Sequence, residues 1–394
     1  MRSIAPRRFL HDVSLPSVAA GFVTVLVGFA SSVVIVFQAA QAMGASAEQI
    51  GSWMWALGLG IGATSIVLSL RWRVPVVTAW STPGAAMLVA STGTGVHIGE
   101  AIGAFVVAAA LGMVAGFSGA FERALRRVPV SLASGMLAGV LLRFGLDAFV
   151  ALQSRLLLGL AMLATYLVGR RAFARHAVLA TLLVGIGVAA AQGLMHWDQV
   201  QLRLSRPVFV MPGFSWQAMI GIALPLFMVT MASQNLPGVA VMRASGYDAP
   251  VSPMLGWIGA VNVVLAPFGA FAINLAAITA AICMGREAAE DPARRYTAAV
   301  SAGVLYLVVG LFGATVAAVL MAFPKELVMA IAGIALFGTI GASLTTAMRE
   351  EREREPALIA FLVTASGLTL GGVGSAFWGL LAGALAMLVL NARR

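Results

Sequence analysis

Long apolar runs separated by short polar breaks fill almost the whole chain. A helix that spans a bilayer needs about 20 mostly apolar residues, whereas a strand of an outer-membrane barrel shows only about 10 residues of alternating polarity. The runs therefore predict an all-α polytopic membrane protein. Counting them between polar breaks gives fourteen transmembrane segments, with approximate limits 15–43, 47–70, 74–92, 97–118, 128–146, 152–169, 175–193, 214–242, 251–267, 269–284, 296–321, 326–347, 356–371 and 374–391.

The positive charges give these segments an orientation, because cytoplasmic loops of membrane proteins carry an excess of Lys and Arg. With the N-terminus inside, 20 of the 25 Lys and Arg residues fall in cytoplasmic segments, and the five outer ones are Arg143, Arg155, Arg203, Arg206 and Lys325. We therefore expect a bacterial inner-membrane protein with both termini in the cytoplasm.

The longest polar interruption, 196–214, divides the chain into two halves of seven segments each, residues 1–200 and 201–394. An odd number of segments in each half places the two halves in opposite orientations across the membrane. This arrangement is typical of transporters built as inverted repeats. The pattern therefore predicts a 7+7 inverted repeat.

The third segment of the first half is expected to be broken. It opens with Val-Pro-Val-Val-Thr at 74–78, and β-branched residues around a proline favour an extended backbone. The next residues are Ser81, Thr82, Pro83 and Gly84, in which hydroxyl side chains can cap free amides and proline suits the first helical turn. The segment is therefore predicted to be a short strand that leads into a half-helix.

The third segment of the second half, 269–284, shows a comparable break at Asn274, a possible cap for a helix of about ten residues. One continuous helix of this length would span only about 24 Å, short of the roughly 30 Å hydrocarbon core. A strand followed by a helix would span about 35 Å. The alternative is that both segments are short helices kinked by proline and glycine.

If the halves are inverted, the two half-helix N-termini face each other near the middle of the bilayer. Such non-helical backbone is tolerated only where it is buried in protein or lines a cavity. Each N-terminus offers free N–H groups and about half a positive charge. Together they would suit one carboxylate without any arginine.

A polar run in segment 8, Thr230-Met-Ala-Ser-Gln-Asn-Leu-Pro-Gly, places Ser233, Gln234 and Asn235 inside an otherwise apolar helix. These side chains could bind a substrate carboxylate or hold the half-helix ends. The alternative is hydrogen bonding between helices, with a kink at the Pro-Gly pair. Gln38 in segment 1 is either a site residue or a headgroup contact.

The composition excludes several other classes of protein. With 60% hydrophobic and 10% charged residues, the chain carries far fewer charges than a soluble domain. The net charge of +10 is spread in groups of two or three arginines without one basic face, so nucleic acid is not an expected partner. The common catalytic and nucleotide-binding motifs and Cys/His clusters do not occur, so we expect no enzyme, no cofactor and no metal site.

The stretches 76–86 (Val-Val-Thr-Ala-Trp-Ser-Thr-Pro-Gly-Ala-Ala) and 230–238 resemble the signature stretches of the benzoate:proton symporters of the BenE type. The resemblance runs the whole length of the chain. It implies the seven-plus-seven fold of nucleobase, sulfate and bicarbonate transporters, in which a core domain carries substrate past a gate domain. By this resemblance the core comprises about 15–118 and 214–321, and the gate about 128–193 and 326–391.

The resemblance also implies a secondary active transporter that imports benzoate or a related aromatic carboxylate with a proton, by alternating access. Import of an anion against a negative interior costs about 2.3 kcal/mol per charge per 100 mV, so accumulation needs a co-transported cation. Segments 1, 3, 8 and 10 carry no Asp, Glu, His, Lys or Arg in their membrane interiors, so the proton is expected to travel on the substrate. The expected substrate-binding residues are Ser81, Thr82, Gly84, Ser233, Gln234, Asn235, Asn274, Leu275 and Gln38, with Trp80 and Phe271 packing on the ring.

Other functions stay open at this point. Another small anion or a nucleobase could be carried on the same fold, although nucleobase transporters of this fold use glutamates in segments 8 and 10, where this chain has only neutral polar residues. A channel should show a continuous polar stripe along several helices, and none is visible in the sequence. A sensor should carry a soluble output domain, and the polar tails are too short for one. The expected partners are the aromatic carboxylate, the proton and the lipid bilayer, and a homodimer is possible.

Overall fold

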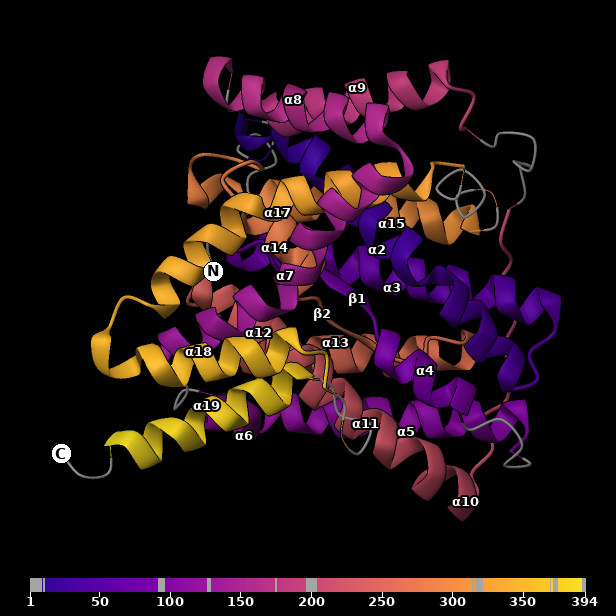
Figure 1. The fold of residues 1–394 in the computed structure, drawn as a ribbon. Coiled ribbons are helices and arrows are strands. Elements are labelled where there is room, and N and C mark those ends of the chain that lie inside the picture. The colour runs from indigo at the N-terminus through magenta and orange to yellow at the C-terminus, as the bar shows by residue number, and fades with distance from the viewer. Residues whose placement is uncertain are drawn as a thin grey trace.

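The computed structural model describes residues 9, 11–90, 96–125, 129–173, 176–195, 204–313, 315, 322–368, 370 and 375–391. This part of the chain is mostly helical, with one two-stranded sheet (Figure 1). The elements of the first half are α2 (Leu15–Ala42), α3 (Ala47–Trp72), β1 (Thr78–Trp80), α4 (Thr82–Ala90), α5 (Ile98–Phe117), α6 (Ala120–Leu125), α7 (Val130–Ser154), α8 (Leu156–Ala172) and α9 (Ala177–Ala191). Those of the second half are α10 (Trp216–Ala218), η3 (Met219–Ala223), α11 (Leu224–Thr230), η4 (Met231–Asn235), α12 (Leu236–Ala244), α13 (Val251–Leu265), η5 (Ala266–Phe268), β2 (Ile273–Leu275), α14 (Ile278–Met284), η6 (Pro292–Arg294), α15 (Tyr296–Leu311), α17 (Lys325–Ala347), α18 (Glu351–Ala365) and α19 (Ser375–Asn391).

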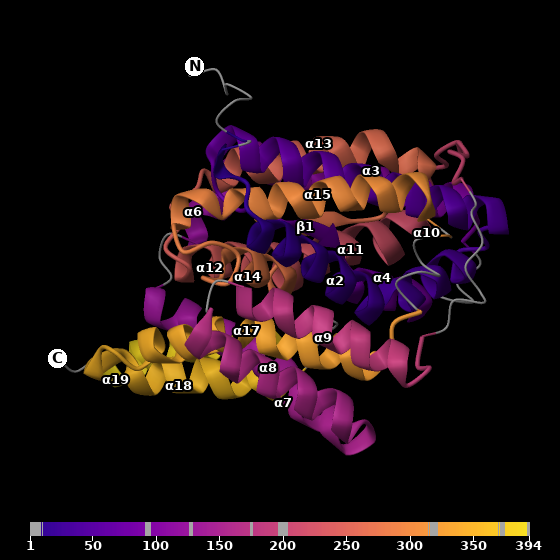
Figure 2. The same ribbon diagram turned by 90° about the horizontal axis from the view of Figure 1, so that it is seen from above.

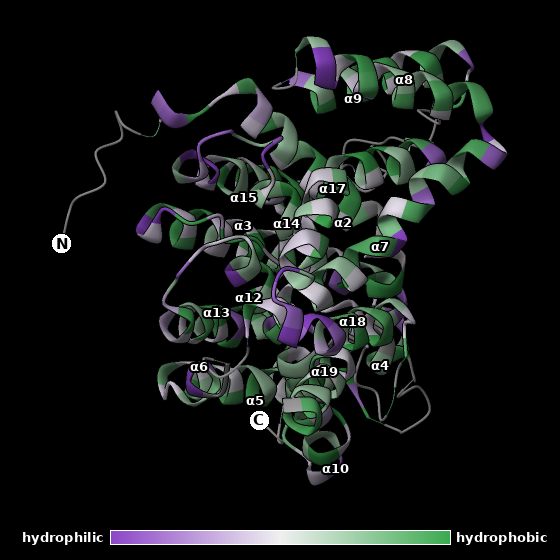
Figure 3. Ribbon diagram, turned by 60° about the vertical axis from the view of Figure 1, so that its left-hand side comes forward, coloured by the Kyte–Doolittle hydropathy of each residue, from purple (hydrophilic) through white to green (hydrophobic). Residues whose placement is uncertain are grey.

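Several described helices are long and apolar enough to cross a membrane. By length and composition these are α3, α5, α7, the helical stretch Trp216–Ala244 and the stretch Val251–Phe268, and a bent pair within α17 would be a sixth. Figure 3 shows hydrophobic residues along the helices and hydrophilic ones mainly at their ends and connections. The half-helices α4 and α14 are too short for this test, and so are further apolar stretches such as Leu15–Phe29, Ala177–Ala191 and Phe377–Leu390, so the count of fourteen segments stays a prediction.

The helices lie in two groups, one beside the other in Figure 2. The first group holds the sheet with α2 to α5 and α10 to α15, and here α3 packs on α15 and α5 on α13. The second group holds α7 to α9 and α17 to α19, in which α7 packs on α17 and α18. Contacts of α7 with α12 and of α17 with α2 and α14 join the two groups.

Glycines allow some of these helices to approach closely, as is common in membranes. A Cβ atom on Gly58 of α3 would lie 2.4 Å from the amide nitrogen of Gly310 of α15. Nothing lies within 4 Å of the same position on Gly51, which is also in α3. The contact between α3 and α15 therefore requires glycine at one position and not at the other.

The helix α3 shows how the sequence sets the first break. Ser46 and Gln49 form a capping box at its start, with Ser46 Oγ accepting from the Gln49 N–H at 3.3 Å and Gln49 Oε1 accepting from the Ser46 N–H at 2.8 Å. At its end Arg73 adopts a left-handed conformation with φ 54°. Pro75 follows, and the chain continues extended into β1.

The strands β1 and β2 pair antiparallel, with Ala79 opposite Asn274 and with Thr78 and Trp80 opposite Leu275 and Ile273. Each strand leads into a short helix, β1 into α4 and β2 into α14. The prediction of a short strand and a half-helix at both breaks is confirmed. One detail was wrong: Asn274 lies in the strand and does not cap a helix, because α14 begins only at Ile278, after the N-cap Ala277.

Hydroxyl side chains of α3 hydrogen-bond to backbone groups at the outer edge of β1 and of the residues just before it. Ser65 Oγ accepts from the Thr78 N–H at 3.0 Å. The hydroxyl of Ser69 both accepts from the Val76 N–H and donates to the Val76 carbonyl, each at 3.0 Å. An unpaired strand edge is costly in an apolar environment, so these hydroxyls make the break possible.

Two asparagines perform the same task for the outer edge of β2. Asn262 of α13 binds Ile273 twice, since its Nδ2 donates to the carbonyl at 2.7 Å and its Oδ1 accepts from the N–H at 2.8 Å. Asn235 Oδ1 accepts from the Leu275 N–H at 2.9 Å. Asn262 and Asn235 are 5% and 3% exposed. The short sheet is therefore held on both sides by buried side chains.

Segment 8 is helical throughout but contains two π-helical stretches, η3 and η4. The second holds Ser233, Gln234 and Asn235, and is followed by Pro237. Proline lacks an N–H group, so it cannot bond the carbonyl of residue 233 in a regular helix. Such π-bulges are frequent at functional sites.

Candidate functional site

A cavity of about 420 Å³ lies where the two broken segments meet the second group of helices. This volume falls in the range of small-molecule sites in proteins. Its walls come from α2, β1, α4, η4, α12, α14 and α15 of the first group and from α7 and α19 of the second. They comprise Val27, Gly28, Ser32, Ala79, Trp80, Thr82, Pro83, Val140, Phe144, Ser233, Gln234, Pro237, Ala276, Ala277, Ile278, Thr279, Tyr306 and Ser375. None of these residues carries a formal charge at neutral pH.

The start of α4 offers fewer free donors than the sequence led us to expect. The Ser81 N–H donates to the Ala272 carbonyl at 2.9 Å, and Ser81 Oγ accepts from the Gly84 N–H at 3.0 Å. Pro83 has no N–H group. Among the described residues the Thr82 N–H is the donor left without a partner at this end.

The start of α14 is more open to a ligand. The Ala276 N–H donates to the Val77 carbonyl at 2.9 Å. For the N–H groups of Ala277, Ile278 and Thr279, no acceptor is found within the described part of the chain, and all three residues line the cavity. Because α14 has only seven residues, these N–H groups are more relevant than the dipole of the whole helix.

Neutral polar side chains complete this part of the cavity. Ser233 and Gln234 come from the π-helical stretch η4, and both are partly exposed to the cavity. The amide of Gln234 and the hydroxyls of Thr82 and Thr279 can donate to an oxygen or accept from one. The arrangement suits a carboxyl group, which takes several hydrogen bonds and needs no counter-charge in the protein.

Aromatic side chains form another part of the wall. The Trp80 indole N–H donates to Ser32 Oγ at 2.9 Å, which fixes the orientation of the ring. Its ring centroid lies 5.6 Å from that of Phe29 and 6.3 Å from that of Tyr306, both edge to face. Phe144 joins them from α7. These rings can pack against an aromatic ligand.

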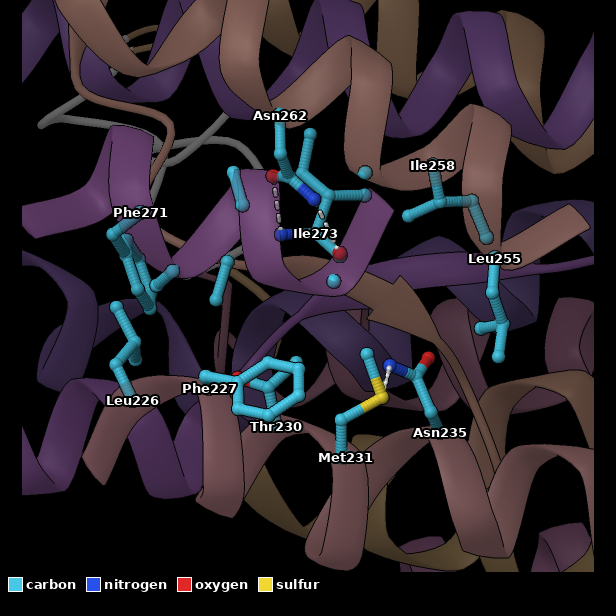
Figure 4. A pocket seen from close by; sticks show the side chains of 15 residues that line it. Leu226, Phe227, Thr230, Met231, Asn235, Leu255, Ile258, Asn262, Phe271 and Ile273 are labelled. Atoms are coloured by element: carbon cyan, nitrogen blue, oxygen red, sulfur yellow. Dashed lines mark hydrogen bonds between the residues drawn. The ribbon is translucent and has the colours of Figure 1, made fainter. Parts of the chain in front are cut away.

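A smaller cavity of about 30 Å³ lies beside β2, next to the asparagines that hold it (Figure 4). Its size suits one water molecule. Phe271 lines it and is 2% exposed, with its ring centroid 5.8 Å from that of Trp53 and 6.2 Å from that of Phe105. Phe271 therefore packs in the core, away from the 420 Å³ cavity.

The structure separates the sequence-predicted site residues into three sets. Trp80, Thr82, Ser233 and Gln234 line the large cavity. The second set lies in the framework around it: Asn235, Asn274 and Leu275 belong to the sheet and its supports, and Ser81 and Gly84 bond to each other at the start of α4. Phe271 lines the small cavity, and Gln38 is exposed on α2.

Asn274 was predicted to bind substrate but is enclosed in the sheet, and several residues near the cavity were not predicted. Asn274 is fully buried, its Nδ2 donates to the Ala272 carbonyl at 3.2 Å, and its Oδ1 has no partner among the described residues. Sequence reasoning missed Ser32, Thr279 and Tyr306 in the cavity wall, and Asn262 behind it. Of these, Asn262 was detectable as a polar residue within an apolar run.

Comparison with known proteins adds the family. Residues 11–389 match the family described as BenE, benzoate membrane transport protein. The chain belongs to the benzoate membrane transport family. It is 48% identical over 382 residues to the inner membrane protein YdcO of Escherichia coli, with 97% of both chains covered. It is 39% identical over 380 residues to a benzoate membrane transport protein of Acinetobacter baylyi, with 96% of both covered. This BenE-family chain is therefore a multi-pass membrane transport protein and not an enzyme.

Solved structures resemble this BenE-family chain at low sequence identity. The overall structure of SLC26A9 aligns with a TM-score of 0.53 and 13% identity, over 98% of this chain and 66% of that one. The transmembrane domain of the cyanobacterial bicarbonate transporter BicA aligns with a TM-score of 0.45 and 14% identity, over 98% of both chains. The SLC26A9 alignment shows a common fold and does not bear on the substrate.

Proposed function

We propose that this protein imports benzoate or a related aromatic carboxylate together with a proton. The observation that carries the proposal is the 420 Å³ cavity at the two strand-to-helix breaks, which combines unpartnered N–H groups, neutral polar side chains and aromatic rings. The relative in Acinetobacter baylyi, a benzoate membrane transport protein by name, supports the same substrate class.

In the proposed complex the carboxylate accepts from the N–H groups of Ile278 and Thr279 and from the Gln234 amide. The ring then lies against Trp80 and Phe144. Hydrogen bonds to a charged group contribute about 1.5–3 kcal/mol each, net of the hydrogen bonds lost to water, so two or three of them can hold the carboxylate in the cavity without a counter-charge in the protein. A site with a carboxylate of its own would repel this ligand, and no Asp or Glu is among the described residues that line the cavity.

Proton coupling follows from energetics. An anion entering a negative interior costs about 2.3 kcal/mol per 100 mV, and one accompanying proton makes the movement electrically neutral. A pH gradient of one unit can then support about tenfold accumulation. The described cavity wall holds no Asp, Glu or His, so in this proposal the proton travels on the substrate: the bound carboxylate takes up a proton from the outer solution and crosses as the neutral acid.

The transport cycle we propose is alternating access in a 7+7 inverted repeat. Counted seven segments apart, α3 corresponds to α13 and α5 to α15, so the contact of α3 with α15 is the counterpart of that of α13 with α5. In the same way the pair α8 and α9 is the counterpart of α18 and α19. These matched contacts support an inverted repeat. The first group of helices acts as the core, about 15–118 and 214–321, and the second as the gate, about 128–193 and 326–391.

The membrane is the bacterial inner membrane, with both termini in the cytoplasm. The name of the relative YdcO, an inner membrane protein, and the excess of Lys and Arg in the predicted cytoplasmic segments support this placement. Another small anion or a nucleobase is the alternative cargo on this fold.

Uptake by purified protein in liposomes tests the function. We expect labelled benzoate to accumulate when the outside is one pH unit more acidic, above the passive entry into protein-free liposomes, and a sodium gradient to have no effect. Unlabelled benzoate should compete, whereas uracil and sulfate should not. Uptake that follows sodium, or competition by uracil or sulfate alone, would contradict the proposal.

A further inference from the structure

A buried carboxylate lies where the two groups of helices meet, away from the large cavity. Glu287 follows α14 by three residues, and its side chain is only 7% exposed. Its Oε1 lies 3.5 Å from Arg170 Nη1, in the last turn of α8. Glu287 belongs to the first group and Arg170 to the second, so the ion pair joins them.

The surroundings of Glu287 offer its carboxylate little stabilisation apart from this ion pair. Oε2 is buried and has no hydrogen-bond partner among the described residues. The space beside the carboxylate is about 10 Å³, at the lower limit for a water, and the other residues that line this space are apolar ones from α2, α9, α14 and α17. A Cβ on Gly338 of α17 would come within 2.8 Å of Oε1, so the second group approaches from two helices.

A buried charge that loses its partner is strongly unfavourable. Glu287 is also close in sequence to α14, whose first residues line the large cavity. Any movement of α14 past α8 must therefore break this pair. By the charge rule above, both residues lie on the cytoplasmic side of the membrane.

We propose that Glu287 and Arg170 form a cytoplasmic latch that holds the two groups of helices together in the state described here. The latch positions α14 against the gate and does not contact substrate. This inference rests on the alternating access proposed above. Breaking of the Glu287–Arg170 ion pair is the step that opens the cavity toward the cytoplasm.

Thiol labelling can test the latch without any substrate. The single native cysteine is buried, and Cys283→Ser with Ser233→Cys places one reporter thiol in the cavity. A membrane-impermeant maleimide applied to inside-out vesicles then reports cytoplasmic access. We expect Arg170→Glu, which places two carboxylates together, to raise the labelling rate at least fivefold. Arg171→Glu, at the exposed neighbouring position, is the matched control and should leave the rate unchanged.

The double variant Arg170→Glu/Glu287→Arg should bring the labelling rate back toward that of the control, which a general loosening of the fold would not do. If the Arg170→Glu variant does not insert into the membrane, Glu287→Gln serves in its place, and its labelling rate is expected to rise at least threefold. Equal labelling in the latch variant and the control, or no return in the double variant, would overturn the latch. Protection of the thiol by benzoate is scored separately, so that a wrong substrate is distinguished from a wrong latch.

Discussion

Replacing Asn262 by Ala tests whether the sheet between the broken segments needs its buried amide support. The amide makes two hydrogen bonds to the backbone of Ile273, at 2.7 and 2.8 Å, and Figure 4 shows both. Each buried backbone group left without a partner costs about 1–3 kcal/mol. A water entering the neighbouring cavity of about 30 Å³ would recover part of this. We therefore expect a destabilisation of about 2–4 kcal/mol.

Equilibrium unfolding in lipid–detergent bicelles, followed by tryptophan fluorescence, measures this loss. Asn235→Ala is the matched comparison because it removes one hydrogen bond to β2 and should cost about half as much. Benzoate affinity should also fall in Asn262→Ala, since β2 positions the N–H groups at the start of α14. If Asn262→Ala costs less than about 0.5 kcal/mol and binds benzoate normally, the sheet does not depend on these bonds and the reasoning fails.

Three further predictions concern the cavity and the helix packing. Gln234→Ala should weaken benzoate binding, measured by titration of purified protein, about tenfold or more, a loss of about 1.4 kcal/mol or more. Gln38→Ala, on the exposed face of α2, is the control and should leave the affinity unchanged. Tyr306→Phe keeps the ring in the cavity wall and should change benzoate affinity less than threefold, and a loss of binding would assign the hydroxyl a direct role. Gly58→Ala should lower the free energy of unfolding by about 1–3 kcal/mol, because its methyl group would overlap the α15 backbone. Gly51→Ala should be neutral or slightly stabilising. Equal effects of the two substitutions would be evidence against close packing at Gly58.

The breaks in segments 3 and 10 could be predicted from sequence because local rules govern them. Pro75 and the β-branched residues near it favour an extended backbone, and the length of 269–284 is too short for a single helix across the bilayer. The exact start of the second half-helix could not be predicted in the same way. Asn274 is a good cap by type, but pairing with Ala79 of β1 keeps it in the strand, and this contact crosses nearly 200 residues of sequence.

The site residues divide according to what holds them in place. Ser233 and Gln234 could be identified as polar residues in an apolar run, and they do line the cavity. Asn235, their neighbour, turns the other way and supports β2. The sequence pattern does not reveal this difference, because it depends on a π-helical turn and on a partner 40 residues away. Ser32 and Tyr306 are unremarkable in sequence and reach the site only through helix packing.

A structure determined with bound benzoate tests the central claim most directly. We expect the carboxylate within hydrogen-bonding distance of the N–H groups of Ile278 and Thr279, and the ring against Trp80, in the cavity between the two groups of helices. Benzoate bound elsewhere, or bound in this cavity with its carboxylate turned away from the start of α14, would contradict the account.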